Sequence, residues 1–473
     1  MSSGTFSNFG GNLWFQPNVV YRPRDEAELL EVIDRCRGRR IRVVGRLHSW
    51  SEAAVGNDVV IDLRGLNDVS LEQRDGRTWV TAGGGCQIKT LQRVLGNAGA
   101  ALPSLGLINE QSIAGAISTG THGSGRESMS NFIEEVRVAT YDSSGTPVIR
   151  AVQGGDTLRA ARCCVGGLGV IIAVGFWARP NYRVEEHFRR YADLEPVLAR
   201  EEAYPLQQYF LMPWWWQFFA QHRRETAERR SATAWLYRLY VFLQFDLGLH
   251  LLTRFVVRVL RSNSAAKLCL RWITPWMVIP NWRVVDDANR QLVMNHELFQ
   301  HIECEMFVVR SRLKESLEQL TRLIKHFDGD RGALDGALRD TLGQLGLLDE
   351  VDANCGTYTH HYPICIRRVL PDDTLISMSS GKAEPSYAIS LISYERRGDR
   401  AGFMAFSRVV SRLMGHLYGA RPHWGKVCPI SAEEAVALYP ELATFRDVCR
   451  DIDPGGVFRG GWVGRVLFGV EEK

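Results

Sequence analysis

Several common signatures are missing from this sequence of 473 residues, and each absence excludes a class of protein. The 57 basic and 53 acidic residues leave a net charge of +4 with no long block of one sign, so no nucleic-acid partner is predicted. None of the ten cysteines lies in a C-x-x-C pair or in a cluster with histidine at zinc-ligand spacing. We therefore predict no metal site.

A targeting signal is also missing, because residues 1–20 contain no basic segment followed by an apolar core. Without paired spacing, the ten cysteines are interpreted as reduced, mostly buried thiols, which is typical of a cytosolic protein. These features predict a cytoplasmic location. The length leaves room for two or three domains.

The first 180 residues predict an α+β domain with many glycine turns. A helix is expected over 23–40 and a strand over 41–44, and Asp-Gly at 75–76 is a hairpin signal. A helix over 89–99, a hairpin over 136–152 and a β-prone run over 166–178 follow. Later, amphipathic spacing predicts a helix over 311–327, paired strands over 374–380 and 387–395, and a helix over 403–419. The second half is therefore expected to form a sheet covered by helices.

Four glycine-rich loops lie within the first 170 residues: RVVGRLHSWS (42–51), AGGG (82–85), SIAGAISTGTHGSG (112–125) and GGLG (166–169). Glycine lets a backbone approach a ligand closely, and successive backbone N–H groups can cradle phosphate oxygens. Any one of these loops alone is more often a simple turn. Together, and without a clear Rossmann frame, they favour a flavin dinucleotide bound by a different fold. His48 follows a Gly-Arg turn directly, where its ring could face such a ligand, although an isolated histidine is more often a hydrogen-bonded core residue.

The motifs GRLHS (45–49), GAALPSLGLINEQSIAGAISTGTHGSG (99–125), GGLGVI (166–171), RPHWGK (421–426) and DIDPGGVF (451–458) resemble one family. It is the aldonolactone oxidase and alditol oxidase branch, similar to L-gulonolactone oxidase, of the vanillyl-alcohol-oxidase flavoprotein superfamily. The resemblance covers nearly all of residues 14–181 and 360–468. It implies a two-domain α+β fold: an FAD-binding (PCMH-type) domain over 1–181, an α/β substrate cap over 182–427 with a hydrophobic insert at about 213–282, and a segment over 428–473 that returns to the FAD domain.

The resemblance also implies a cofactor site for FAD, with His48 at the position that carries the flavin covalently in many members. The other implied cofactor-binding residues are Gly45, Arg46, Leu47, Ser49, Gly83, Ser112, Gly115, Ser118, Thr119, Gly120, Thr121, His122, Gly123, Gly125, Gly166, Gly169, Ile171 and His423.

On the substrate side, the resemblance implies that Lys426 of HWGK and Arg367 bind substrate and assist catalysis, and that Ser124 is a small polar contact. Dehydrogenation of a carbinol needs a hydride path to flavin N5 and groups that stabilise the charge left on oxygen, a role that suits cations. Taken without the resemblance, either cation is more often a solvated surface residue. The expected enzyme oxidises a CH–OH group of a sugar lactone, an alditol or a related carbohydrate, and passes electrons to oxygen or another acceptor.

One position departs from the family pattern. The family usually has Glu-x-Arg where this chain has Cys365-Ile366-Arg367, and a thiol cannot replace a carboxylate unless it ionises. Glu305 and Glu395 are candidates for the missing acid, with an exposed strand-end glutamate an equal alternative for Glu395.

Residues 213–282 are aromatic, apolar and basic. Arg238, Asp246 and Arg254 interrupt the segment, so we do not expect a simple transmembrane helix. Trp214 to Trp216 beside Arg223 and Arg224, with the later Arg254, Arg258, Arg261 and Lys267, fit an interfacial pattern with peripheral membrane contact, and packing in the cap core or at a dimer interface fits equally well. An alternative hypothesis is therefore a membrane-surface protein with a flavin fold that acts on a lipid-linked sugar or has lost turnover.

Overall fold

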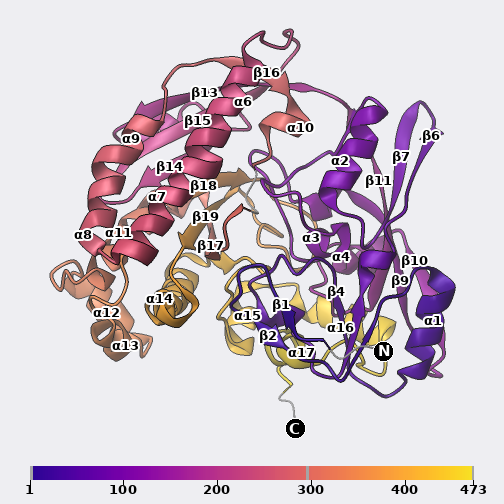
Figure 1. The fold of residues 1–473 in the computed structure, drawn as a ribbon. Helices are drawn as coiled ribbons and strands as arrows, with labels where there is room; N and C mark the ends of the chain where they lie inside the picture. Colours follow the sequence, from indigo (N-terminus) through magenta and orange to yellow (C-terminus); the bar gives the residue numbers. More distant parts are fainter. Residues whose placement is uncertain (1–3, 295–297, 471–473) are drawn as a thin grey trace. The chain divides into compact units, whose positions relative to one another are not determined.

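The computed structural model describes residues 4–294 and 298–470, which divide into two compact units. Unit 1 comprises residues 1–182, 370–383 and 431–473, and unit 2 comprises residues 183–369 and 384–430 (Figure 1). The domain boundaries predicted from the sequence, after residues 181 and 427, lie within three residues of the observed ones after 182 and 430. The sequence analysis also placed residues 370–383 in the cap, whereas their contacts group them with unit 1.

In its described residues, unit 1 is built on a parallel three-stranded sheet, β3-β5-β4, and an antiparallel five-stranded sheet, β10-β9-β11-β7-β6. The strands are β3 (Val19–Tyr21), β4 (Ile41–Val44), β5 (Val59–Asp62), β6 (Val69–Arg74), β7 (Arg77–Gly83), β9 (Ile133–Tyr141), β10 (Pro147–Val152) and β11 (Val170–Trp177), with the short pairs β1 (Phe6–Ser7) with β2 (Trp14–Phe15) and β8 (Ala100–Ala101) with β12 (Arg179–Pro180). The helices are α1 (Glu26–Arg35), α2 (Ile88–Asn97), α3 (Ile113–Ser118), α4 (Gly155–Arg162), α15 (Ala432–Leu438), α16 (Leu442–Ile452) and α17 (Gly461–Phe468), with short turns η1 (Glu52–Ala54), η2 (Leu63–Gly65) and η3 (Met129–Phe132).

Local sequence signals explain much of unit 1. The hairpin predicted at Asp75-Gly76 joins β6 to β7, and both residues have a positive φ, as a two-residue hairpin turn requires. Helix α1 begins after Asp25, whose side chain accepts a hydrogen bond from the backbone N–H of Glu28. The predicted helix over 23–40 and hairpin over 136–152 are thus confirmed as α1 and as β9 with β10.

The C-terminal segment packs against the first strands of unit 1. The buried guanidinium of Arg42 donates to the backbone oxygens of Phe458 and Gly460, and Thr140 Oγ1 donates to the oxygen of Ile452. Arg42 therefore binds residues that lie more than 400 positions later in the chain. This contact agrees with the prediction that the C-terminal segment returns to the first domain.

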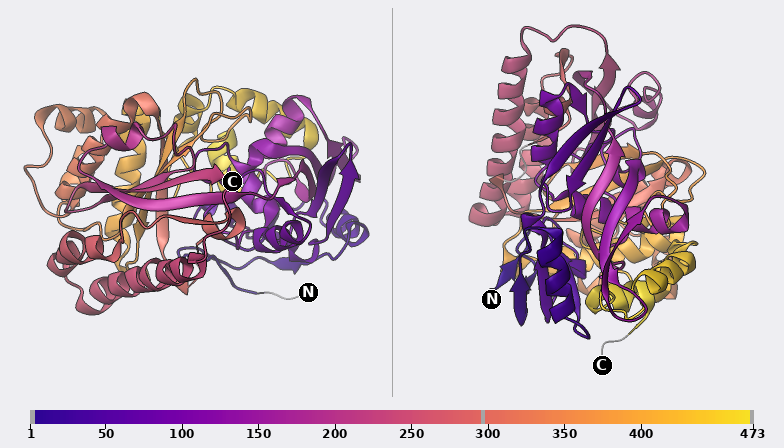
Figure 2. Two further views of the ribbon diagram at one scale, coloured as in Figure 1. Left: turned by 90° about the horizontal axis from the view of Figure 1, so that it is seen from above. Right: turned by 90° about the vertical axis from the view of Figure 1, so that its right-hand side faces the viewer.

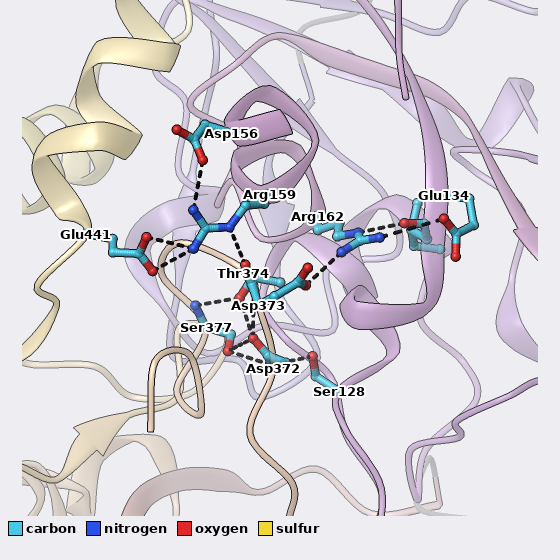
Figure 3. A network of polar contacts seen from close by, with 11 residues as sticks. Ser128, Glu134, Asp156, Arg159, Arg162, Asp372, Asp373, Thr374, Ser377 and Glu441 are labelled. Atoms are coloured by element: carbon cyan, nitrogen blue, oxygen red, sulfur yellow. Dashed lines mark hydrogen bonds and ion pairs between the residues drawn. The ribbon is translucent and has the colours of Figure 1, made fainter. Parts of the chain in front are cut away.

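Residues 370–383 are held in unit 1 by a polar network centred on Asp372. Its carboxylate accepts hydrogen bonds from Ser128, Thr374 and Ser377 at 2.7–3.1 Å (Figure 3). The carboxylate of the neighbouring Asp373 accepts a hydrogen bond from Arg162 Nη1 at 2.7 Å. The strand predicted over 374–380 is wrong, because these side-chain bonds fold the segment into turns instead.

Within the described residues, unit 2 contains an eight-stranded sheet of order β16-β13-β15-β14-β18-β19-β17-β20. Its strands are β13 (Arg183–Tyr191), β14 (Gln208–Met212), β15 (Gln217–Thr226), β16 (Val284–Asp287), β17 (Ile302–Val309), β18 (Ile364–Val369), β19 (Ser386–Ser393) and β20 (Arg421–Pro422). Helices α11 (Leu313–Phe327) and α14 (Ala401–Tyr418), both predicted, pack on each other through Phe327 and Phe406, whose ring centroids are 5.2 Å apart. Shorter elements are α5 (Glu195–Leu198), α10 (Ala288–Gln291), η8 (Arg310–Arg312), α12 (Gly336–Gln344), α13 (Leu348–Ala353) and η9 (Arg397–Asp399).

The hydrophobic insert forms two helical stretches in unit 2. The first is a continuous helix over Ala234–Leu260, made of α6 (Ala234–Val241), η4 (Phe242–Leu249), α7 (His250–Arg254) and η5 (Phe255–Leu260). The second comprises α8 (Asn263–Leu268), η6 (Cys269–Ile273) and α9 (Thr274–Met277). Figure 2 shows the first stretch as one unbroken helix alongside the strands of unit 2.

The interfacial pattern expected around Trp214 to Trp216 is not found. All three rings are half-buried in the turn between β14 and β15, where Trp214 Nε1 donates to the backbone oxygen of His360 at 2.8 Å. Arg223 forms a buried ion pair with Glu186 at 2.5 Å. These side chains therefore stabilise unit 2, and its exposed apolar residues lie elsewhere.

Candidate active site

A groove of about 130 Å³ runs through unit 1, and most of its lining comes from the glycine loops. Of the residues proposed to bind a cofactor, the groove is lined by Gly45, Arg46, Leu47, His48, Ser49, Ser112, Gly115, Ser118, Thr119, Gly166, Gly169 and Ile171. Gly83, Gly120, Thr121, His122, Gly123 and Gly125 lie in unit 1 outside this lining, and His423 belongs to unit 2. Three loops that are far apart in the sequence thus meet at one groove.

The backbone of this groove is shaped for close approach of a ligand. A Cβ added at Gly45 would lie 2.5 Å from Ser112 Oγ, so only glycine lets these two loops touch. A Cβ at Gly115 would meet no atom within 4 Å, so this position leaves open space in the lining. Ser112 Oγ is buried and has no hydrogen-bond partner among residues 4–294 and 298–470. A bound group with polar oxygens or nitrogens, such as the dinucleotide part of FAD, fits these features.

His48 lies in the lining of the groove and is half-buried. Its ring packs against Phe9, with centroids 4.7 Å apart. The preceding residue, Leu47, has φ +55°, a conformation that costs energy for a residue other than glycine. Strain of this kind is maintained where the surrounding structure fixes a side chain, and here it fixes the direction of His48.

The sequence analysis missed several lining residues, namely Arg42, Val43, Val44, Ala53, Ala54, Leu63, Gln111, Ala114 and Val165. Only Arg42 could have been singled out among them from the sequence, because an arginine inside the apolar strand Ile41–Val44 must be paired if the strand is buried. The small apolar residues carried no such signal.

Unit 2 contains a cluster of buried charges on strands β17 and β18. Arg367 lies 2.6 Å from Glu305 and donates to Ser390 Oγ at 3.1 Å, and Ser390 donates to Glu305 at 2.5 Å. The Nζ of Lys426 pairs with Glu303, and both of these side chains are largely buried. Two of the three predicted catalytic residues, Lys426 and Arg367, are therefore neighbours of paired carboxylates.

Sheet register explains why these side chains meet. Cys365 lies opposite Ser390 in the β18–β19 pair, and Ser390 lies opposite Glu305 in the β19–β17 pair. Residues directly opposite in antiparallel strands share a face, so these three side chains point to the same side of the sheet. Glu305, one of the two candidate acids, thus contacts Arg367 from a strand two positions away.

The electrostatics of the cluster separate the thiol from the cation. Burial raises the pKa of the Cys365 thiol to about 11, with Arg367 opposing this shift. Burial alone would lower the pKa of Arg367, but the charge of Glu305 and its neighbours raises it above its usual value. At neutral pH the site therefore presents a cation and a neutral thiol, and Cys365 does not act as a carboxylate.

Glu395, the other candidate acid, lies beyond the end of β19 and receives a hydrogen bond from Ser393 at 3.2 Å. Burial raises its pKa to about 7. Arg367 pairs with Glu305 and Lys426 with Glu303, so Glu305 and Glu303 are the acids of the cluster. Ser124, the third predicted catalytic residue, is half-buried in unit 1.

An apolar cavity of about 170 Å³ lies on the same face of the sheet, beneath the Ala234–Leu260 helix. Its apolar lining comprises Phe188, Phe210, Met212, Phe219, Tyr237, Val241, Phe242, Phe245, Leu249, Val278, Val293, Met294, Tyr362 and Pro363. Phe210 pairs directly with Cys365 across β14 and β18. Cys365 therefore lies at the border between the apolar cavity and the charged cluster.

Comparison with known families gives matches over most of the chain. Residues 17–148 match the FAD binding domain family, and residues 179–466 match the D-arabinono-1,4-lactone oxidase family. A long-chain alcohol oxidase of an uncultured marine euryarchaeote is 49% identical over 461 residues, covering 97% of this chain and 96% of the relative. An L-gulono-1,4-lactone dehydrogenase of Mycobacterium tuberculosis is 27% identical, and the match covers 98% of this chain and 99% of the relative. An alditol oxidase of Streptomyces is also 27% identical, and the match covers 99% of this chain and 100% of the relative.

Among solved structures, a cholesterol oxidase from B. sterolicum superimposes with a TM-score of 0.73 at 15% identity, over 98% of this chain and 97% of its own. At this identity the match concerns the fold alone. It confirms the predicted two-domain α+β flavoprotein fold.

Proposed function

Because the chain belongs to the D-arabinono-1,4-lactone oxidase family of FAD-linked oxidoreductases, we propose that its charged cluster binds and orients a CH–OH group of a substrate, which bound FAD would oxidise. The chain is a flavoprotein whose cofactor is FAD, and it is an oxidoreductase acting on CH–OH donors. Bound FAD supplies the hydride acceptor. Oxygen or another acceptor would then receive the electrons.

The observation that carries this proposal is the state of Arg367. Its Nη2 is paired with Glu305, whereas its Nε is buried and has no hydrogen-bond partner among the described residues. A buried N–H without a partner is costly, so it points to a ligand that completes it. A substrate hydroxyl oxygen would accept this hydrogen bond and would be stabilised as its proton leaves.

The surrounding residues fix this geometry. Glu305 and Ser390 hold the guanidinium from one side, and Glu303 holds the ammonium of Lys426. Both cations are thus positioned before substrate binds, and they need little reorganisation when charge develops on oxygen. Lys426 and Arg367 would then orient the CH–OH group, as the family resemblance implies.

A sugar lactone or an alditol is the substrate class supported by the family match and by the lactone dehydrogenase and alditol oxidase relatives. Such substrates carry several hydroxyl groups, which suit the paired carboxylates Glu303 and Glu305 as acceptors. These relatives are named as catalysts, which supports turnover over a binding protein that has lost it.

A second candidate is a long-chain alcohol, and a specific observation favours it. Most of the side chains that line the cavity beside Cys365 are aromatic or aliphatic, which suits an alkyl chain, and the polar lining residues, such as Arg238 and Gln221, would face its hydroxyl end. The neutral thiol of Cys365 separates this cavity from the charged cluster, whereas a carboxylate there would need a polar partner. The relative named as a long-chain alcohol oxidase is also the one with 49% identity.

The test is a substrate panel with matched variants. We expect flavin-loaded protein to oxidise members of at least one class, 1-alkanols or lactones and alditols, measured as oxygen uptake and as reduction of a dye. Replacing Arg367 by methionine should lower kcat/KM by about 10²–10³-fold, as for loss of one oxyanion donor. The control is Arg368→Met on the same strand: its Nε is also buried without a partner among the described residues, but it points to the opposite face of the sheet, where Arg368 donates to the backbone oxygen of Pro205. No turnover with either class, or equal effects of the two variants, would refute the proposal.

The covalent link to FAD is part of the same proposal. Its support is that His48 lines the groove on a strained turn and stands at the family position that carries flavin.

A further inference from the structure

The Ala234–Leu260 helix and the 263–277 helices expose a continuous set of large apolar side chains. On the first helix these are Trp235, Leu236, Leu239, Phe242, Leu243, Leu251, Phe255, Val259 and Leu260, and in the following segment they are Leu268, Trp272, Ile273, Trp276 and Ile279. Trp276 is 86% exposed and Val259 63%. Scattered exposed apolar residues are normal, but a concentration of this size on one segment marks an interaction surface.

The opposite side of the same helix is fixed to unit 2. Tyr237 donates to Glu186 at 2.6 Å, the buried His250 bonds to Tyr394, and Arg258 Nε donates to the backbone oxygen of Tyr394 at 2.7 Å. These contacts occur at the beginning, middle and end of the helix. Its apolar exposed side is therefore presented by a rigid support.

Among the described residues, one helix is long and apolar enough to cross a membrane by length and composition, and it is this one, over Ala234–Leu260. Crossing a bilayer would pull the polar contacts of Tyr237, His250 and Arg258 away from unit 2 and would leave Asp246 in hydrocarbon. Asp246 is only 4% exposed on the unit 2 side. An orientation parallel to a membrane surface keeps every one of these contacts.

Charge decides which partner fits this surface. Residues 229–283 contain nine basic residues, Arg229, Arg230, Arg238, Arg254, Arg258, Arg261, Lys267, Arg271 and Arg283. The segment has one acidic residue, the buried Asp246. Five of the nine basic residues pair with carboxylates outside the segment: Arg230 and Arg238 with Asp286, Arg261 with Asp399, Lys267 with Asp328 and Arg283 with Glu185. Arg261, at the C-terminal end of the first helix, and Arg271, within the second helical stretch, are both exposed beside exposed apolar side chains. Aromatic rings with flanking arginines are typical of the layer where lipid headgroups meet acyl chains, and they favour anionic lipid.

We propose that this surface, formed by the exposed side chains of residues 235–279, docks on an anionic lipid bilayer with the long helix parallel to the membrane. Docking of this kind would make the chain a peripheral membrane protein. Phe242 belongs both to the exposed surface and to the lining of the apolar cavity, so the docked helix is the wall between lipid and cavity. A long-chain substrate would then be taken up from the bilayer, a step that rests on the proposed function.

The first experiment measures cosedimentation of the flavin-loaded protein with vesicles, without substrate. Vesicles of phosphatidylcholine with phosphatidylglycerol should bind the protein. The variant Val259→Gln/Trp272→Gln/Trp276→Gln should bind at least tenfold more weakly, because it removes three of the most exposed apolar groups. The matched control is Trp14→Gln/Val436→Gln/Val470→Gln, which removes side chains of 54–55% exposure from unit 1 and should bind like the wild type.

A second variant separates the electrostatic contribution. Arg261→Gln/Arg271→Gln should lower binding to anionic vesicles by about fivefold per arginine and leave binding to pure phosphatidylcholine unchanged. Absence of wild-type binding, or equal binding of the two triple variants, would overturn the proposal. So would a wild-type dimer that becomes monomeric in the Val259→Gln/Trp272→Gln/Trp276→Gln variant without any vesicle binding. Turnover is not measured here, so failure of docking and failure of the proposed oxidation are distinguished.

Discussion

The apolar cavity makes a quantitative prediction about substrate chain length. Each methylene group transferred from water to an apolar site contributes about 0.8 kcal/mol, or about fourfold in kcat/KM when the chain is held in the transition state. Lengthening a 1-alkanol by three methylenes should then raise kcat/KM by about sixtyfold, as long as the cavity has room. Beyond that length the gain should stop, because the cavity has a volume of only about 170 Å³.

Filling the cavity should abolish this gain. Val241 lines it from helix α6, so Val241→Phe places additional bulk in the space that the alkyl chain would occupy. We expect the slope of log kcat/KM against chain length to flatten at a shorter alcohol. The control, Val259→Phe, makes the same change on the exposed side of the same helix, where Val259 is 63% exposed.

The assay is steady-state oxidation of a homologous series of 1-alkanols by both variants and the wild type, below the concentration at which the alcohols form micelles. A kcat/KM that does not change with chain length would refute the reasoning. Identical profiles for Val241→Phe and Val259→Phe would also refute it, and would leave the carbohydrate class as the supported substrate.

Three further predictions concern the groove and the thiol. Gly115→Ala should weaken FAD binding in a fluorescence titration, and it should stabilise the helix of the apoprotein by up to about 1 kcal/mol because the added Cβ meets open space. The control, Gly343→Ala, also adds a Cβ in open space and should stabilise its helix without changing FAD binding. Equal FAD affinity in the two variants would place the cofactor elsewhere. Denatured wild-type protein should retain flavin fluorescence on a gel and His48→Ala should not, so a retained signal in the variant excludes His48 as the attachment point. The Cys365 thiol has a pKa of about 11 in the folded protein and near 9.0 when unfolded, so its contribution to stability is complete below pH 9 and is lost as the pH rises toward 11. The unfolding free energy of Cys365→Ser should therefore fall less steeply than that of the wild type over this range, and parallel curves would contradict the assignment.

The features that sequence could predict are those set by neighbouring residues. The turn at Asp75-Gly76, the helix ending at Gly419 and the amphipathic helix over 313–327 depend on local backbone preference and apolar spacing. The glycine loops were recognisable from their composition, although the reason for Gly45, its close approach to Ser112, lies in a contact between distant loops.

Long-range pairing was harder to predict. Glu305 could be named as a candidate partner of Arg367, but the choice between it and Glu395 depends on strand order β18-β19-β17, which periodicity does not specify. The strand expected over 374–380 failed because Asp372 gathers three hydroxyl donors there. Burial of Arg223 depends on its pairing with Glu186, so a basic residue beside tryptophans looked exposed in the sequence and is not.

The central claim is that the chain is an FAD-dependent oxidoreductase in which Arg367 and Lys426 bind the CH–OH group that is oxidised. The most direct measurement is anaerobic mixing of flavin-loaded protein with 1-alkanols, lactones and alditols, followed by the visible absorbance of the oxidised flavin. We predict that at least one donor bleaches this absorbance in a single turnover, and that Arg367→Met slows the bleaching by about 10²–10³-fold while Arg368→Met does not. Flavin that no donor of either class reduces, or that both variants reduce at the wild-type rate, would contradict the account.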